Sequence, residues 1–265
     1  SASNGNAMSL CQKQRQRRWK RKPGININVC FGAIPKRARA RAGRITVSNI
    51  HAAMSTSTAT PALSTVKKVC YPNKLSRPLS DNEPELIKWG KGNEQTARLN
   101  YTSQTTTLHR GLNVEKCGFI INPSFPELGA TPDALVYCEC CGKSCVEIKC
   151  PNTHRNHNLL QACEDDTFCL TLTDGIVELK QTHKYYKQVQ AQMFVTRSEF
   201  CDFVVWTTKA CVIIRVRPDA RMWGQLLQVA QEFFYKVAMP ELVAHHPPRG
   251  WAKCGDVISL ACDDN

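Results

Sequence analysis

The sequence lacks a long apolar run. Its most apolar stretch, residues 203–216, is interrupted by polar residues and is shorter than the ~20 residues that cross a bilayer. No apolar segment of the kind that directs secretion is visible near the first residues. We therefore expect a soluble protein without membrane contacts, intracellular, in the nucleus or the cytoplasm, and not secreted. Internal repeats are also missing, which favours one domain.

The sequence also lacks the features of a disulfide framework. It has 15 cysteines, an odd number, and no export signal accompanies them. Reduced thiols are the expectation, and metal binding is the alternative.

A second C-x-x-C pair is missing as well. Cys138 and Cys141 form one such pair, but zinc needs four ligands. Adjacent strand residues point to opposite faces, so Cys140 and Cys141 are not expected to bind the same ion. We favour a tight turn of reduced thiols over a structural Zn²⁺. The zinc alternative uses Cys138, Cys141, Cys145 and Cys150, and other candidates for the fourth ligand are Cys140, His154, His157, Cys163 and Cys169.

Positive charge is abundant. The 35 basic and 22 acidic residues give a net charge of +13, which favours a polyanionic partner such as DNA. Much of this charge lies in residues 13–22 and 36–44. We expect residues 1–30 to form a disordered basic tail, residues 31–243 the folded domain, and residues 244–265 an irregular tail.

Hydrophobic periodicity predicts one α/β (α+β) domain, in which helices flank a central mixed β-sheet. Residues 118–139 read as two strands, and residues 145–151 as a short strand stopped by proline. Ser48 is expected to cap a short helix. Hairpins are predicted at residues 168–180, with an Asp174-Gly175 turn, and at 200–219; helices are predicted at 82–105, 183–197 and 220–242, the last ending near Pro240.

Three residues form a candidate catalytic group. Asp133 heads one strand, and Glu147 and Lys149 lie two apart on the next strand, so they share a face. If the strands pair through the cysteine-rich turn, the two carboxylates converge. Such a hard-oxygen pair suits Mg²⁺. The simpler alternative is a surface ion pair between Glu147 and Lys149.

The stretches "GATPDALV", "VEIKCP" and "WGKGNEQTA" resemble the PD-(D/E)xK nuclease superfamily. More narrowly, residues 36–242 resemble the YqaJ-type viral recombinase group, the family of phage lambda exonuclease. The resemblance implies a restriction-endonuclease-like core and a Mg²⁺-dependent deoxyribonuclease, with Mn²⁺ able to substitute. It further implies a 5′→3′ exonuclease that acts on 5′-phosphorylated double-stranded DNA ends in recombination, and a homotrimer.

The resemblance also implies residue roles. The metal ligands are Asp133, Glu147, the carbonyl of Ile148 and, through a second metal or water, Glu94. Lys149 and Gln188 position or activate the attacking water. The 5′-phosphate is held by Arg41, Ser48, Thr131 and Arg155.

Simpler interpretations stay open for several of these residues. Glu94 could be an exposed helix residue, Gln188 part of a polar helix face, and Arg41 a solvated charge. Relative to the phage enzyme, the spacer between Asp133 and Glu147 is longer and rich in cysteine, and residues 168–180 are an insertion. The competing functions are an endonuclease on internal or structured DNA and a non-catalytic DNA-binding or assembly module.

Overall fold

The computed structural model describes residues 40–72 and 84–245. The predicted basic tail, residues 1–30, lies outside these ranges. Of the predicted C-terminal tail, only residues 244 and 245 are described, and they belong to helix α10 (Met239–His245) rather than to irregular chain. None of the helices within the two described ranges combines the length and the apolar character that a membrane span requires.

A five-stranded sheet forms the centre of the fold. Its order is β10-β9-β6-β5-β2, and only the β6–β9 pair is parallel, so the sheet is mixed as predicted. Its strands are β2 (Asn113–Glu115), β5 (Ala134–Cys138), β6 (Gly142–Lys149), β9 (Cys201–Trp206) and β10 (Cys211–Val216). β6 is the middle strand and is buried over most of its length.

Two helices cover the two faces of this sheet. α6 (Glu85–Thr106) packs Ala97 and Tyr101 against Val146 and Ile148 of β6. α8 (Lys184–Thr196) packs against the opposite face, where Cys145 of β6 lies in the core. Because side chains alternate along a strand, Glu147 and Lys149 face α8.

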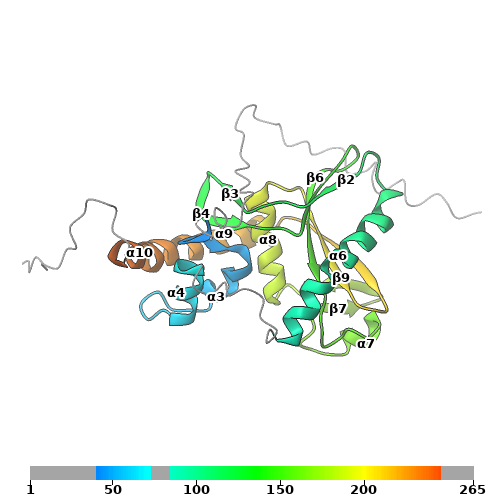
Figure 1. Ribbon diagram of the computed structural model, residues 1–265, viewed down its shortest axis with the longest axis horizontal. Coiled ribbons are helices and arrows are strands. Elements are labelled where there is room, and N and C mark those ends of the chain that lie inside the picture. Colours follow the sequence, from blue (N-terminus) through cyan, green and yellow to red (C-terminus); the bar gives the residue numbers. More distant parts are fainter. Residues whose placement is uncertain (1–39, 73–83, 246–265) are drawn as a thin grey trace, which may run out of the picture.

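A smaller sheet lies on the other side of α8 (Figure 1). It consists of β1 (Ile45–Thr46), β4 (Phe125–Ala130) and β3 (Ile120–Asn122). Around it lie η1 (Val47–Asn49), α3 (Ile50–Met54), α4 (Leu63–Cys70) and α9 (Ala220–Phe233), whose apolar faces share one core with α8. The remaining elements are α7 (Leu159–Cys163), the hairpin β7 (Leu170–Thr173) and β8 (Ile176–Leu179), and the π-helical turn η2 (Phe234–Ala238).

A hydrogen-bond network around the buried Asp202 of β9 fastens α6 to the sheet. Both carboxylate oxygens of Asp202 accept hydrogen bonds from Arg215, at 2.9 and 3.0 Å. The hydroxyl of Tyr101 on α6 donates to Asp202 at 2.9 Å. Asp202 is almost fully buried, so this network satisfies a charge that would otherwise be costly inside the protein.

Three local predictions were wrong. Residues 118–139 hold three strands, not two, because β4 pairs with β3 and β1 whereas β5 joins the larger sheet. Ser48 does not cap a helix; it lies within η1, and its hydroxyl hydrogen-bonds Thr46 at 3.0 Å. Pro240 does not end the last helix, because the wider π turn η2 precedes it and the chain continues as α10.

The two predicted hairpins and the helices at 82–105 and 183–197 were confirmed to within three residues at each end. Asp174 and Gly175 both have positive φ, 52° and 77°, as a tight hairpin turn requires.

Candidate active site

The β5–β6 hairpin places Asp133 opposite Glu147. Ala134 pairs with Val146, and the amide of Asp133 donates to the carbonyl of Val146 at 3.0 Å. One carboxylate oxygen of Asp133 accepts a 2.6 Å hydrogen bond from the amide of Ile148. The two halves of the predicted acidic group therefore meet at one end of the hairpin, joined through the cysteine-rich turn at the other end.

Glu147 is the most constrained member of this group, at 3% exposure. Its Oε1 accepts hydrogen bonds from Lys149 Nζ at 2.6 Å and from Gln188 Nε2 at 2.5 Å. Its Oε2 is buried and has no hydrogen-bond partner among the described residues. A buried carboxylate oxygen without a partner is costly, so this atom fits a ligand position for a cation.

The pKa values of Asp133 and Lys149 are both raised, but for different reasons. Burial, and then the neighbouring Glu147, raise the pKa of Asp133 to about 8. Burial alone would lower the pKa of Lys149, but Glu147 outweighs it, and the pKa lies above its ordinary value. The ammonium also lies 4.5 Å from the centre of the Tyr185 ring. Lys149 therefore stays a cation at neutral pH and can donate a proton in a hydrogen bond but not act as a base.

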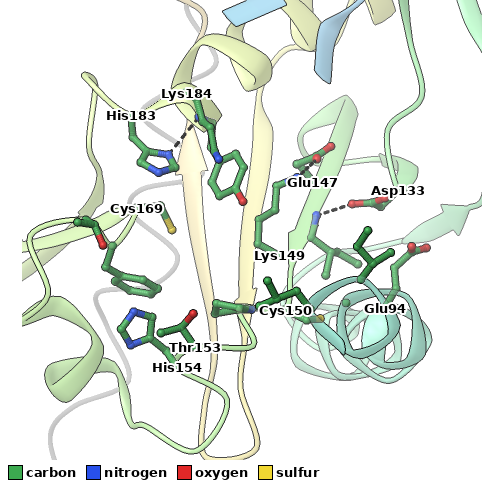
Figure 2. A pocket seen from close by; sticks show the side chains of 18 of the residues that line it. Glu94, Asp133, Glu147, Lys149, Cys150, Thr153, His154, Cys169, His183 and Lys184 are labelled. Atoms are coloured by element: carbon green, nitrogen blue, oxygen red, sulfur yellow. Dashed lines mark hydrogen bonds and ion pairs between the residues drawn. The ribbon is translucent and has the colours of Figure 1, made fainter. Parts of the chain in front are cut away.

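A cavity of about 550 Å³ opens beside these side chains. Asp133, Glu147 and Lys149 line it from the hairpin, and Glu94 lines it from α6 (Figure 2). The Glu94 side chain is 40% exposed, and its ion pair with Arg98 is long, at 3.5 Å. Carboxylate oxygens from two elements thus line one space, which is the donor set that Mg²⁺ prefers.

Sequence reasoning missed part of this cavity. His154 lines it and hydrogen-bonds Asp165 at 3.1 Å, and His183, which caps α8 by accepting from the amide of Tyr185, lines it as well. The sequence pattern offers His154 only as a candidate zinc ligand. The available signal was its position three residues after Pro151, in the segment that follows the Glu-x-Lys strand.

Gln188 lies behind Glu147 rather than in the cavity. It is buried on α8 and holds Glu147 Oε1. The structure thus brings Gln188 to the catalytic group, but it contacts the Glu147 carboxylate, whereas the family resemblance implies a role on the attacking water. It is positioned to orient Glu147.

The four candidate phosphate-binding residues fall into two groups. Arg41 donates to the Thr131 hydroxyl at 2.9 Å, and its guanidinium lies 5.3 Å from the Phe119 ring centre. Ser48 is exposed in η1, directly after β1, which runs parallel to β4. Arg155 instead contacts Asn152 at 3.2 Å and the ring of Trp89 on α6, 5.7 Å from its centre.

A model of the YqaJ-like viral recombinase domain matches residues 38–199, which is more than half of the chain. The chain belongs to this family. The YqaJ-like domain is also similar to two solved structures of LHK-Exo, an alkaline exonuclease from Laribacter hongkongensis. The structure in complex with dAMP has a TM-score of 0.57 and 23% identity, and the match covers 78% of this chain and 94% of that one. The other has a TM-score of 0.55 with the same identity and coverage.

At this level of identity the likeness establishes the fold, an exonuclease-type nuclease fold, as the sequence predicted. A comparison with curated protein sequences found no match to the chain.

In this YqaJ-like domain the cysteines do not group as the zinc alternative with Cys138, Cys141, Cys145 and Cys150 requires. Cys145 lies on β6 within the core, and Cys150 lines the cavity beside Asp133. Cys138 and Cys141 do come together, but with Cys140 and His109. The alternation rule failed for Cys140 because residues 139–141 form a turn, where neighbouring side chains can share a side.

Proposed function

We propose that this chain is a Mg²⁺-dependent DNA exonuclease that degrades double-stranded ends in the 5′→3′ direction. The observation that carries the proposal is the buried, unpartnered Oε2 of Glu147, opposite Asp133 and on a cavity that Glu94 also lines. Family membership and the likeness to an alkaline exonuclease support the same reaction class.

In this proposal Asp133, Glu147 and the carbonyl of Ile148 hold the metal, and Glu94 contributes directly or through water. Mn²⁺ can replace Mg²⁺ because it accepts the same oxygen ligands. The bound metal supplies a Lewis acid that neutralises charge on the scissile phosphate.

The chain's own residues supply the remaining chemistry. Lys149 is cationic and fixed between Glu147 and the Tyr185 ring, so it can orient the attacking water and stabilise charge on the phosphate. Gln188 fixes the orientation of Glu147 and is therefore a positioning residue. Lys149 and Gln188 are both held for these roles by short hydrogen bonds to Glu147.

Registration of the DNA end is assigned to Arg41, Thr131, Ser48 and Arg155. The guanidinium of Arg41 is held by Thr131 and the Phe119 ring, and such a fixed fork suits a terminal phosphate. Arg155 is held against Trp89 of α6, the helix that also carries Glu94, where it can bind a neighbouring phosphate. A homotrimer, implied by the family resemblance, stays a prediction that solution mass measurements would test.

The test compares linear and covalently closed circular DNA, with and without Mg²⁺, and with 5′-phosphate or 5′-hydroxyl ends. We expect loss of linear 5′-phosphorylated DNA only, and no loss with Asp133→Asn. Cleavage of the circle would establish an endonuclease instead. Binding without any cleavage would establish a non-catalytic module.

Arg41→Ala tests the phosphate pocket. It should reduce the preference for 5′-phosphorylated over 5′-hydroxyl ends, because a charged hydrogen bond to the phosphate contributes ~1.5–3 kcal/mol. Lys67→Ala, an exposed lysine on α4, is the matched control. An unchanged preference in Arg41→Ala would refute the pocket while leaving the metal site standing.

A further inference from the structure

A compact cluster of three thiols and one imidazole lies at the far end of the β5–β6 hairpin. Cys138 ends β5, and Cys140 and Cys141 follow in the turn. His109 comes from the turn after α6. The four candidate ligand atoms all lie within 4.8 Å of one another. Asp133 is five residues before Cys138 along an extended strand, so this cluster is ~17 Å from the catalytic carboxylates.

Five of the six separations among these atoms lie within about 0.4 Å of the edges of a zinc tetrahedron. Bonds of ~2.3 Å to sulfur and ~2.0 Å to nitrogen at tetrahedral angles place sulfurs about 3.8 Å apart and sulfur about 3.5 Å from nitrogen. Here His109 Nδ1 lies 3.2 Å from Cys140, 3.5 Å from Cys138 and 3.6 Å from Cys141. The Cys140 sulfur lies 3.4 Å from Cys138 and 3.7 Å from Cys141.

Hydrogen bonds among reduced thiols do not account for this arrangement. An imidazole nitrogen either donates one proton or accepts one, so Nδ1 can satisfy only one of the three sulfurs around it. A single cation at the centre satisfies all four atoms at once. The amide of Cys141 also donates to the Cys138 sulfur at 3.3 Å, which is the type of contact that stabilises a metal-bound thiolate.

We infer that His109, Cys138, Cys140 and Cys141 form a structural Zn²⁺ site. Three soft sulfurs and one imidazole in a tetrahedron select zinc over the hard cations that suit the carboxylate cavity. All four protein ligands are present, so no open position is left for a substrate, and the site is structural rather than catalytic. Binding releases the protons of the three thiols.

The site joins the two elements that carry the acidic residues of the cavity. His109 follows α6, the helix of Glu94, while the cysteines belong to the hairpin of Asp133 and Glu147. The same two segments already touch, since the amide of Glu139 donates to the carbonyl of Arg110 at 3.0 Å. A bound zinc would therefore fix the position of α6 against the hairpin.

Metal content is the first test. The full chain, produced with added zinc and washed free of loose metal, should contain about one zinc ion per chain by plasma mass spectrometry. Cys140→Ser should lose it, whereas Cys163→Ser, a half-buried cysteine on α7, should keep it. Asp133→Asn with Glu147→Gln should also keep it, which separates this site from the catalytic cavity.

Cobalt provides a second measurement that does not depend on any variant folding. Co²⁺ added to the zinc-free wild-type chain should give the intense bands of tetrahedral thiolate coordination, and Zn²⁺ should abolish them.

His109→Cys should restore the zinc content that His109→Ala loses, because a thiolate can replace the imidazole. Four results would each overturn the inference. The wild-type chain could lack both zinc and cobalt bands, or could hold iron in place of zinc. Alternatively, Cys140→Ser could retain zinc, or the carboxylate variant could lose it.

Discussion

Proton and metal should compete for Asp133, and the competition can be measured through pH. The pKa of Asp133 is raised to about 8, whereas its ordinary value is 3.8. At pH 6 only about one chain in a hundred would have this carboxyl ionised, which corresponds to ~2.7 kcal/mol at 1.36 kcal/mol for each pKa unit. The apparent affinity for Mg²⁺ should therefore fall about a hundredfold from pH 9 to pH 6.

The stability of the metal-free protein should change with pH in the opposite direction to the Mg²⁺ affinity. Between pH 4 and pH 8 the folded chain holds a proton on Asp133 that the unfolded chain releases, so the free energy of unfolding falls as pH rises through this window. Mg²⁺ at a hundred times its dissociation constant adds ~2.7 kcal/mol. For a domain of this size that raises Tm by about 5–10 °C.

The assay is thermal unfolding during Mg²⁺ titrations at several pH values between 6 and 9, with any bound zinc kept constant. Asp133→Asn is the control, and its residual response to Mg²⁺ should lose the pH dependence below pH 8. Equal apparent Mg²⁺ affinity at pH 6 and pH 9 in the wild-type chain would refute the proposed competition between proton and metal for Asp133.

Substitutions at three further residues test separate parts of the molecule. Lys149→Ala should reduce cleavage by ~10²–10³-fold while DNA binding persists in a gel-shift assay, because it removes charge stabilisation at the phosphate; retained activity would contradict this role. Gln188→Leu removes one of the two hydrogen bonds to Oε1 of Glu147, so we expect a lower kcat with little change in KM. Gln188→Glu should shift the pH profile of cleavage, which a purely structural role would not do. Arg215→Met leaves the buried Asp202 without its ion partner, and denaturant unfolding should show a loss of ~3–5 kcal/mol with the catalytic pH profile unchanged.

The central part of the fold was predictable because its signals are local. Alternating apolar residues and the Asp174-Gly175 turn identify strands and a hairpin, and the pairing of β5 with β6 follows from the short spacer between them. That pairing brings Asp133 to Glu147 without any further information. The sequence left open which sheet each strand joins, since β4 and β5 are separated by only three residues yet belong to different sheets.

Other parts of the site depend on contacts that no spacing rule reaches. His109 precedes Cys138 by 29 residues and lies in a polar turn, so its place beside three cysteines depends on how α6 packs on the sheet. The position of Gln188 against Glu147 similarly depends on the rotation of α8, because several glutamines on that helix are buried. Arg41 and Thr131, 90 residues apart, meet only through the parallel pairing of β1 and β4.

The register of the β5–β6 hairpin has a consequence for how such domains can diverge. The residue pairs of the two strands run in order from Ala134–Val146, beside the carboxylates, to Cys138–Gly142, beside the turn. Residues added or removed at the turn leave every pair nearer the cavity unchanged, whereas a slip of one residue within a strand would exchange Glu147 for Ile148 on the face that meets α8. The interval between the aspartate and the Glu-x-Lys is therefore free to vary in length, and searches for distant members of the family should fix the strand pattern and leave that interval open.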